Sequence, residues 1–311
     1  MATIPEALAV WFALAVVGLT VLVTYTRVPS AELYHVSEHG VTSGLGRALV
    51  FLNFPVALAA VPVALIAAAI IRRRAATAVA LLVVASAAVV PFVVDQNDLD
   101  AKPGNAVPAV GVALALLLTL AAARRGAPLV PRRLPGDPLR AVLAAALVVI
   151  AVPWFFAELG FYAPDPILAD EPSPGEPVRA VHLGHHHGTD GVLLALTALA
   201  LTRLTARLPP SRSVSVASSY LALLLVYGVA NAAQDAWQEQ VVKRGTTAHA
   251  LPSVLLPRLT VAWGLLLVLA ALVEALWLRR ERRPSRETGP ARESIAEADP
   301  GAPEVAARSR Y

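Results

Sequence analysis

Residues 47–74 read RALVFLNFPVALAAVPVALIAAAIIRRR, a long apolar run that ends in three consecutive arginines. An α-helix rises about 1.5 Å per residue, so about 20 apolar residues cross the hydrocarbon core of a bilayer. Because backbone polar groups in lipid must be satisfied within the segment, such runs are expected to be helices. Similar runs recur along the chain and predict about eight spans, at residues 6–26, 47–71, 75–95, 106–124, 141–162, 190–208, 213–234 and 259–279. The expected fold is therefore all-α, a polytopic transmembrane helix bundle.

The composition agrees with this fold class. The chain is 57% hydrophobic and 15% charged, which leaves too little polar surface for a soluble domain of 311 residues. There is no cysteine, which excludes disulfides, thiolate metal sites, iron–sulfur clusters and cysteine nucleophiles. Lys102 and Lys243 are the only lysines among 26 basic residues, and this arginine bias with abundant Ala, Val and Leu indicates a GC-rich bacterial genome.

The charges of the connectors alternate along the chain. Arginines follow every second span: Arg72–Arg74, Arg124, Arg125, Arg132, Arg133, Arg140, Arg203, Arg207, Arg212, Arg279, Arg280, Arg282 and Arg283. The connectors between them are acidic. The positive-inside rule then places the arginine-rich connectors and both termini in the cytoplasm of a cell (plasma) membrane. The arginines are explained by this topology, so the bilayer is the expected partner and nucleic acid is not.

The two ends of the chain differ in character. The leader before the first span carries no Lys or Arg, and no A-x-A cleavage site follows the span, so it is expected to be a retained helix. The last residues are polar and proline-containing and lack apolar periodicity. The expected division is a transmembrane helical domain at residues 1–280 and a disordered cytoplasmic tail at residues 281–311.

All seven histidines fall in the acidic connectors, and four of them lie within residues 182–187, HLGHHH. His182, His185 and His186 have the spacing i, i+3, i+4. His35 and His39 share one face if residues 31–39 form a short helix. Imidazole and carboxylate ligands without thiolate suit zinc, copper or iron. These five histidines are the predicted metal ligands, and solvated histidines without a ligand are the alternative.

Three carboxylates are the candidates for acid–base chemistry. Glu158 lies about one turn from the outer end of its span, where a charge is costly unless it is protonated, paired or facing a cavity. Asp190 lies in the first turn of the sixth span, where an N-cap role is the simpler interpretation. Glu239 extends a stripe formed with Asn231 and Asp235, which must face protein or water rather than lipid. A wet helix end and side chains that reach the interface are the alternatives for Glu239 and Glu158.

The segments HVSEH (residues 35–39) and HLGHH (residues 182–186) fit the patterns HxxxH and HxxHH. They resemble two of the histidine boxes of membrane-bound fatty-acid desaturases and hydroxylases, whose histidines hold two irons. The chain departs from that family, because a third box is missing, because the arginines place the boxes outside the cytoplasm and because more spans are present. Membership is therefore not expected.

The sequence thus predicts a multi-pass membrane protein whose extracytoplasmic face binds a divalent transition metal. A metal with an open coordination position could activate water, so a metal-dependent membrane enzyme is the extension of this hypothesis. Two alternatives stay open: a small-solute transporter or permease, and a structural or assembly protein without catalytic activity. The span centres are nearly pure Ala, Leu and Val, which argues against an ion-coupled pump.

Overall fold

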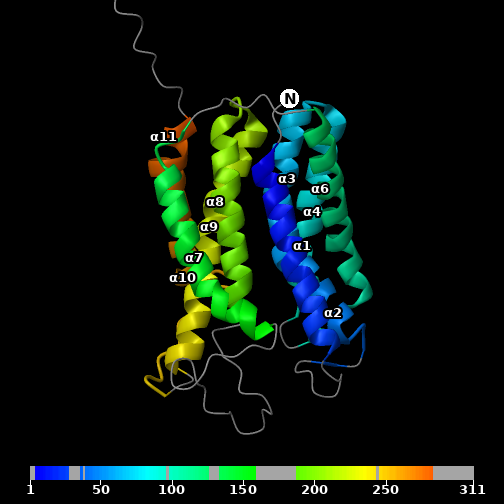
Figure 1. The fold of residues 1–311 in the computed structure, drawn as a ribbon, viewed down its shortest axis with the longest axis vertical. Coiled ribbons are helices and arrows are strands. Elements are labelled where there is room, and N and C mark those ends of the chain that lie inside the picture. Colours follow the sequence, from blue (N-terminus) through cyan, green and yellow to red (C-terminus); the bar gives the residue numbers. More distant parts are fainter. Residues whose placement is uncertain are drawn as a thin grey trace, which may run out of the picture.

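The structure is a computed structural model that describes residues 4–27, 36–37, 39–95, 98–125, 133–158, 187–242 and 245–282; the side chains of residues 153, 154, 156–158, 187, 239 and 240 are not described. The described residues form an all-α bundle of eight long helical segments (Figure 1). In chain order these are α1 (Pro5–Thr26); α2 (Ser43–Phe51), η2 (Leu52–Val56) and α3 (Ala57–Ile71); α4 (Arg74–Ala87) with α5 (Val90–Val93); η3 (Pro103–Asn105) with α6 (Ala106–Arg125); α7 (Asp137–Glu158); α8 (His187–Arg207); α9 (Arg212–Trp237) with η4 (Gln238–Val242); and α10 (Val261–Val273), η5 (Glu274–Leu278) and α11 (Arg279–Arg282).

Seven of these segments are long and apolar enough to cross a membrane within the described residues, and α7 is the eighth long helix beside them. The chain is therefore a multi-pass membrane protein, as the apolar runs predict. The second segment, residues 43–71, is 89% buried over its most apolar window, whereas α1 is 22% buried over its own. α3 is thus a central helix, and α1 presents large side chains such as Phe12 to the surroundings.

The helices fall into two groups of four consecutive segments (Figure 1). α1–α6 form one side of the molecule and α7–α11 form the other, and they meet where α3 packs against α9 and α1 packs against α8. Buried Ala, Val and Leu side chains from both groups form one continuous core. We refer to these groups as the N-terminal half and the C-terminal half.

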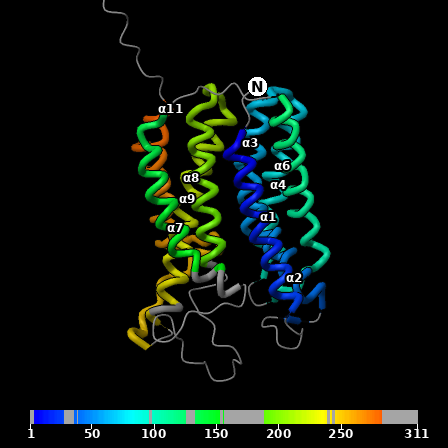
Figure 2. The backbone as a smooth tube through the Cα atoms, viewed as in Figure 1, coloured from blue at the N-terminus to red at the C-terminus, as the bar shows by residue number. Residues whose placement is uncertain are grey.

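Consecutive segments run in opposite directions, so the connectors gather at two ends of the bundle (Figure 2). One end, here the arginine end, holds residues 4–6, 71–74, 124–125, 133–140, 203–212 and 279–282. The other end, here the histidine end, holds residues 36–43, 93–105, 158, 187–191, 235–242 and 245–261. The described chain begins and ends at the arginine end (Figure 1). Within the described residues, the arginine-rich connectors lie at the end opposite to the described histidines, and Arg27, Arg47 and Arg258 lie at the histidine end. The side of the membrane that each end faces stays a prediction.

Local sequence explains where the second segment departs from regular α-helix. Pro55 has no N–H to donate, and the helix widens to a π-helix over Leu52–Val56 around it. Asn53 in this stretch is fully buried, and its amide donates to the Leu49 carbonyl of its own segment at 2.5 Å. Its Oδ1 is buried and has no hydrogen-bond partner among the described residues.

Candidate functional site at the histidine end

The first turn of α8 is fixed from α9 by a carboxylate. The N–H of Gly188 donates to Oδ2 of Asp235 at 2.8 Å, and both residues are buried. A negative charge at a helix N-terminus is favourable because the helix dipole places partial positive charge there. The first turn of α8, which begins at His187, therefore lies beside a carboxylate of another helix.

The polar stripe on α9 faces protein, as its spacing predicts. Asn231 is 2% exposed and Asp235 is 7% exposed, one helical turn apart. The amide of Asn231 donates to the Tyr227 carbonyl at 3.0 Å. Glu239 follows in η4, where the π-helical turn changes the register of the stripe, and its side chain lies outside the described part of the chain.

Two glycines let α8 and α9 approach each other this closely. A Cβ on Gly191 would lie 2.5 Å from the Gly228 carbonyl oxygen and 2.8 Å from the Ala232 nitrogen. A Cβ on Gly228 would in turn lie 2.5 Å from the Gly191 oxygen. Small residues at a helix crossing allow backbone contact in membrane bundles. Gly191 lies three residues after Gly188, so this contact holds Asp190 and Asp235 at one helix crossing.

The connector between α9 and α10 folds back over this region. Tyr227 donates its hydroxyl to the Leu255 carbonyl at 2.8 Å, and Trp237 donates its indole N–H to the His249 carbonyl, also at 2.8 Å. Asp190 is half-buried in the first turn of α8. The acid–base candidate Asp190 thus lies at the α8–α9 crossing and not in an open loop.

The first two connectors of the histidine end bind each other across the N-terminal half. Val41 and Ala101 exchange backbone hydrogen bonds of 2.9 and 3.0 Å, and the Ser37 N–H donates to Oδ2 of Asp100 at 3.0 Å. The expected helix over residues 31–39 is wrong at its described residues, because Val36, Ser37 and His39 are not helical. The Asp100 carboxylate accepts from the Ser37 N–H and the Ser37 hydroxyl, and the sequence does not reveal this contact because it joins two different connectors.

An ion pair lies next to this contact. Nζ of Lys102 lies 2.6 Å from Oδ2 of Asp98. The hydrogen bond from Lys102 holds the pKa of the Asp98 carboxyl below its ordinary value, and the same contact raises the pKa of Lys102. Both side chains lie at the rim of the bundle, so they stabilise the connector and are not part of the α8–α9 crossing.

The predicted ligands differ in how far the structure places them. His39 is exposed beside Asp100, in the N-terminal half. Glu158 ends α7, and its side chain is outside the described part. The remaining predicted ligands, His35, His182, His185 and His186, lie outside the described residues. Among the side chains that the structure describes, no three His, Asp or Glu residues are grouped so as to hold a metal ion.

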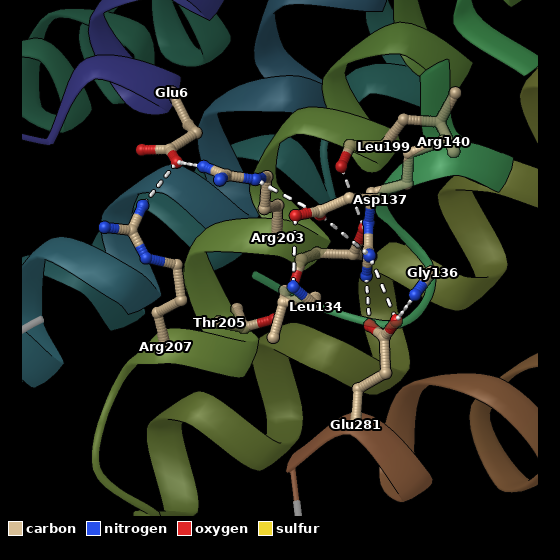
Figure 3. Close-up of polar contacts among 11 residues, drawn as sticks. Glu6, Leu134, Gly136, Asp137, Arg140, Leu199, Arg203, Thr205, Arg207 and Glu281 are labelled. Atoms are coloured by element: carbon tan, nitrogen blue, oxygen red, sulfur yellow. Dashed lines mark hydrogen bonds and ion pairs between the residues drawn. The ribbon is translucent and has the colours of Figure 1, made fainter. Parts of the chain in front are cut away.

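The arginine end holds an ion-pair network that sequence reasoning missed (Figure 3). Glu6 at the start of α1 accepts from Arg203 at 2.7 Å and from Arg207 at 2.8 Å, and this joins the two halves. Arg203 also lies 3.2 Å from Asp137 at the start of α7. The sequence contains an indication of this network. Few acidic residues lie among these arginines, so each carboxylate has several possible cationic partners.

The C-terminal helix is attached to α7 by a buried pair in the same network (Figure 3). Arg140 forms a two-pronged ion pair with Glu281, and Glu281 also accepts from the Gly136 N–H at 2.7 Å. Arg140 is 5% exposed and Glu281 is 7% exposed, and the guanidinium lies over the Trp277 ring at 4.9 Å. Glu281, expected in the tail, is therefore part of the packed bundle, and the last described helix ends at Arg282.

Glu274, buried in η5, has several partners at the same end. Arg279 lies 3.5 Å from it, Arg282 lies closer, and Ser218 of α9 donates a hydrogen bond of 2.9 Å.

Comparisons of this chain with protein-family models, with curated proteins and with solved structures find no match.

Proposed function

We propose that this multi-pass protein binds a divalent transition metal at its histidine end, on the extracytoplasmic side of the cell membrane. His182, His185 and His186 are the principal ligands, and Asp190 supplies a carboxylate at the same helix start. His35 and His39 of the first connector are the second ligand set. Zinc, copper and iron fit imidazole and carboxylate ligands in the absence of cysteine.

The observation that carries the proposal is the hydrogen bond from Gly188 N to Asp235 Oδ2. It fixes Gly188, which directly follows the HLGHHH segment in the sequence. In this proposal, Asp235 orients an imidazole of that segment and raises its basicity, as a neighbouring carboxylate can. Asp235 is a positioning residue in this proposal, and Asp190 is the nearer ligand or acid–base group.

The arginine distribution supports the orientation. The described arginines of the connectors between helices lie at the opposite end from His39, His187 and His249, apart from Arg27 and Arg258. Arginine-rich short connectors stay in the cytoplasm, which leaves the histidine end outside. A bound metal with an open position would supply an activated water there, and Asp190 or Glu158 would exchange protons with it.

Metal content of the purified protein tests the proposal. The wild-type protein, purified in detergent without a polyhistidine tag, is expected to carry about one zinc, copper or iron per chain. The double variant His185→Ala/His186→Ala should lose most of it, and Asp235→Asn should weaken binding about tenfold through the lost positioning contact.

His249→Ala is the matched control, because His249 is exposed at the same end and its hydrogen bonds with Trp237 and Thr247 use backbone groups, which alanine keeps. Its metal content should equal that of the wild type. Metal far below one ion per chain in the wild type, or equal metal in all four proteins, would refute the proposal. Reporter fusions after Arg74 and after Glu176 test the orientation separately, and a cytoplasmic signal after Glu176 would reverse it.

A further inference from the structure

Five arginines of the N-terminal half lie at the arginine end without an acidic partner among the described residues. They are Arg72, Arg73 and Arg74 between α3 and α4, and Arg124 and Arg125 at the end of α6; all are exposed. No carboxylate of the described residues forms an ion pair with any of them. We call this set the arginine surface.

The backbone holds the arginine surface in a short, fixed turn. α3 ends at Ile71 and α4 begins at Arg74, so only Arg72 and Arg73 connect them. Arg72 has the left-handed conformation, with φ +54°, and Arg73 is extended. Nη1 of Arg125 donates to the Ile71 carbonyl at 2.9 Å, which ties the end of α6 to this turn. The five arginines therefore lie on the α3–α4 turn and on the end of α6, which is bonded to that turn.

At the same end, several arginines of the C-terminal half form ion pairs. Arg140, Arg203 and Arg207 pair with Glu281, Asp137 and Glu6, and Arg279 and Arg282 pair with Glu274. Arg212 and Arg280 form no ion pair with a described carboxylate, and they lie on different helices, at the start of α9 and in α11. The positive-inside rule explains why this end is positively charged. It does not explain why the five arginines of the arginine surface lie together without an ion pair among the described residues.

We propose that the arginine surface binds the phosphodiester headgroups of anionic phospholipids. Arg72 follows the last apolar residue of α3, and Arg124 follows Ala123 of α6, so both lie where a span leaves the hydrocarbon and meets lipid phosphates. A guanidinium binds phosphate through two parallel hydrogen bonds. α4 also begins without a side-chain cap and with Arg74 in its first turn, an unfavourable charge that a bound anion would offset.

Lipid retention measured by native mass spectrometry tests this inference. The protein in detergent is offered phosphatidylglycerol or phosphatidylcholine, and the wild type is expected to retain phosphatidylglycerol preferentially. The double variant Arg73→Gln/Arg124→Gln should bind phosphatidylglycerol about 25-fold more weakly, since each arginine near anionic lipid contributes about fivefold. The variant Arg73→Lys/Arg124→Lys keeps the charge and loses the paired hydrogen bonds, so it should lie between the two.

Arg212→Gln/Arg280→Gln is the matched control, because it removes two exposed, unpaired arginines from the same end of the other half. It should retain phosphatidylglycerol as the wild type does. Equal loss in both glutamine variants would overturn the inference, because charge at this end would then be the whole effect. Equal retention of the two lipids by the wild type would overturn it as well. Displacement of the lipid by millimolar inorganic phosphate would assign the surface to a free anion instead.

Discussion

At the arginine end, carboxylates pair with guanidinium groups of other helices, whereas at the histidine end Asp235 and Asp100 accept from backbone N–H groups. Glu281 and Arg140 are both buried, so each neutralises a charge that the bundle would otherwise enclose. Asp235 instead completes the first turn of α8. Loss of Glu281 would therefore leave the buried charge of Arg140 at the arginine end. Loss of Asp235 would leave the Gly188 N–H without this acceptor at the histidine end.

The two ends are thus suited to different roles. The network of Glu6, Asp137 and Glu281 joins α1, α7, α8 and α11, and it holds the two halves together at the arginine end (Figure 3). At the histidine end, Asp98 pairs with Lys102, and Asp100 and Asp235 accept hydrogen bonds from backbone N–H groups of other segments. A binding site is expected where carboxylates are oriented by backbone groups, and this favours the histidine end.

The largest expected effect is the loss of the buried pair. Glu281→Ala leaves Arg140 buried without its carboxylate, and it should lower the free energy of unfolding by about 3–5 kcal/mol. Denaturant-induced unfolding of the detergent-solubilised protein measures this. Arg280→Ala, an exposed neighbour, should change the same quantity by less than about 0.5 kcal/mol.

A double variant separates the pair from its surroundings. Arg140→Met/Glu281→Leu replaces both charges with apolar groups, so it should recover most of the stability that Glu281→Ala loses. If the double variant is as unstable as the single one, the hydrogen bonds to Gly136 and Thr202 carry the stability, and the ion pair does not.

The next effect concerns the helix crossing on which the histidine end depends. Gly191→Ala places a methyl group 2.5 Å from the Gly228 carbonyl oxygen, so α8 and α9 must separate. The expected loss is about 1–3 kcal/mol in the free energy of unfolding, with weaker metal binding because Gly188 moves away from Asp235. Gly264→Ala is the control: no atom lies within 4 Å of its added Cβ, and alanine should stabilise that helix by up to about 1 kcal/mol. Equal effects at the two glycines would show that the crossing tolerates the methyl group.

The spans and the separation of charges could be predicted because both depend on local sequence. Apolar length fixes a membrane helix, and residues one turn apart such as Asn231 and Asp235 share a face wherever the helix lies. The pairing of Arg140 with Glu281 joins residues 141 positions apart, and several other arginines were equally eligible partners in the sequence. Periodicity does not select among them.

The failure at His39 has the same cause. Local signals at residues 31–39 favour a helix, but the Asp100 carboxylate binds the Ser37 N–H from a connector 63 positions away. A long-range contact therefore overrides local helix propensity. The α8–α9 crossing was also hidden, because Gly191 and Gly228 acquire their meaning only when the two helices are seen to touch.

The smallest effect is expected at Lys102, an exposed partner at the histidine end. Folding lowers the pKa of Asp98 below 3.8 and raises the pKa of Lys102 above 10.5, and their mutual contact is the main cause. A depressed carboxyl pKa contributes stability above its unfolded value, which is lost as the pH falls through the folded value. A raised amine pKa contributes stability below its unfolded value, which is lost as the pH rises through the folded value.

Lys102→Met should therefore be slightly less stable than the wild type on a plateau between about pH 4 and pH 10, and the two proteins should converge outside it. Unfolding midpoints measured across this range test the prediction. A difference that stays constant down to pH 2 would mean that Lys102 contributes packing and not charge. The stability difference between Lys102→Met and the wild type should shrink in high salt, because Lys102 is exposed and salt screens exposed charges. The loss of stability in Glu281→Ala should not shrink, because Glu281 and Arg140 are buried.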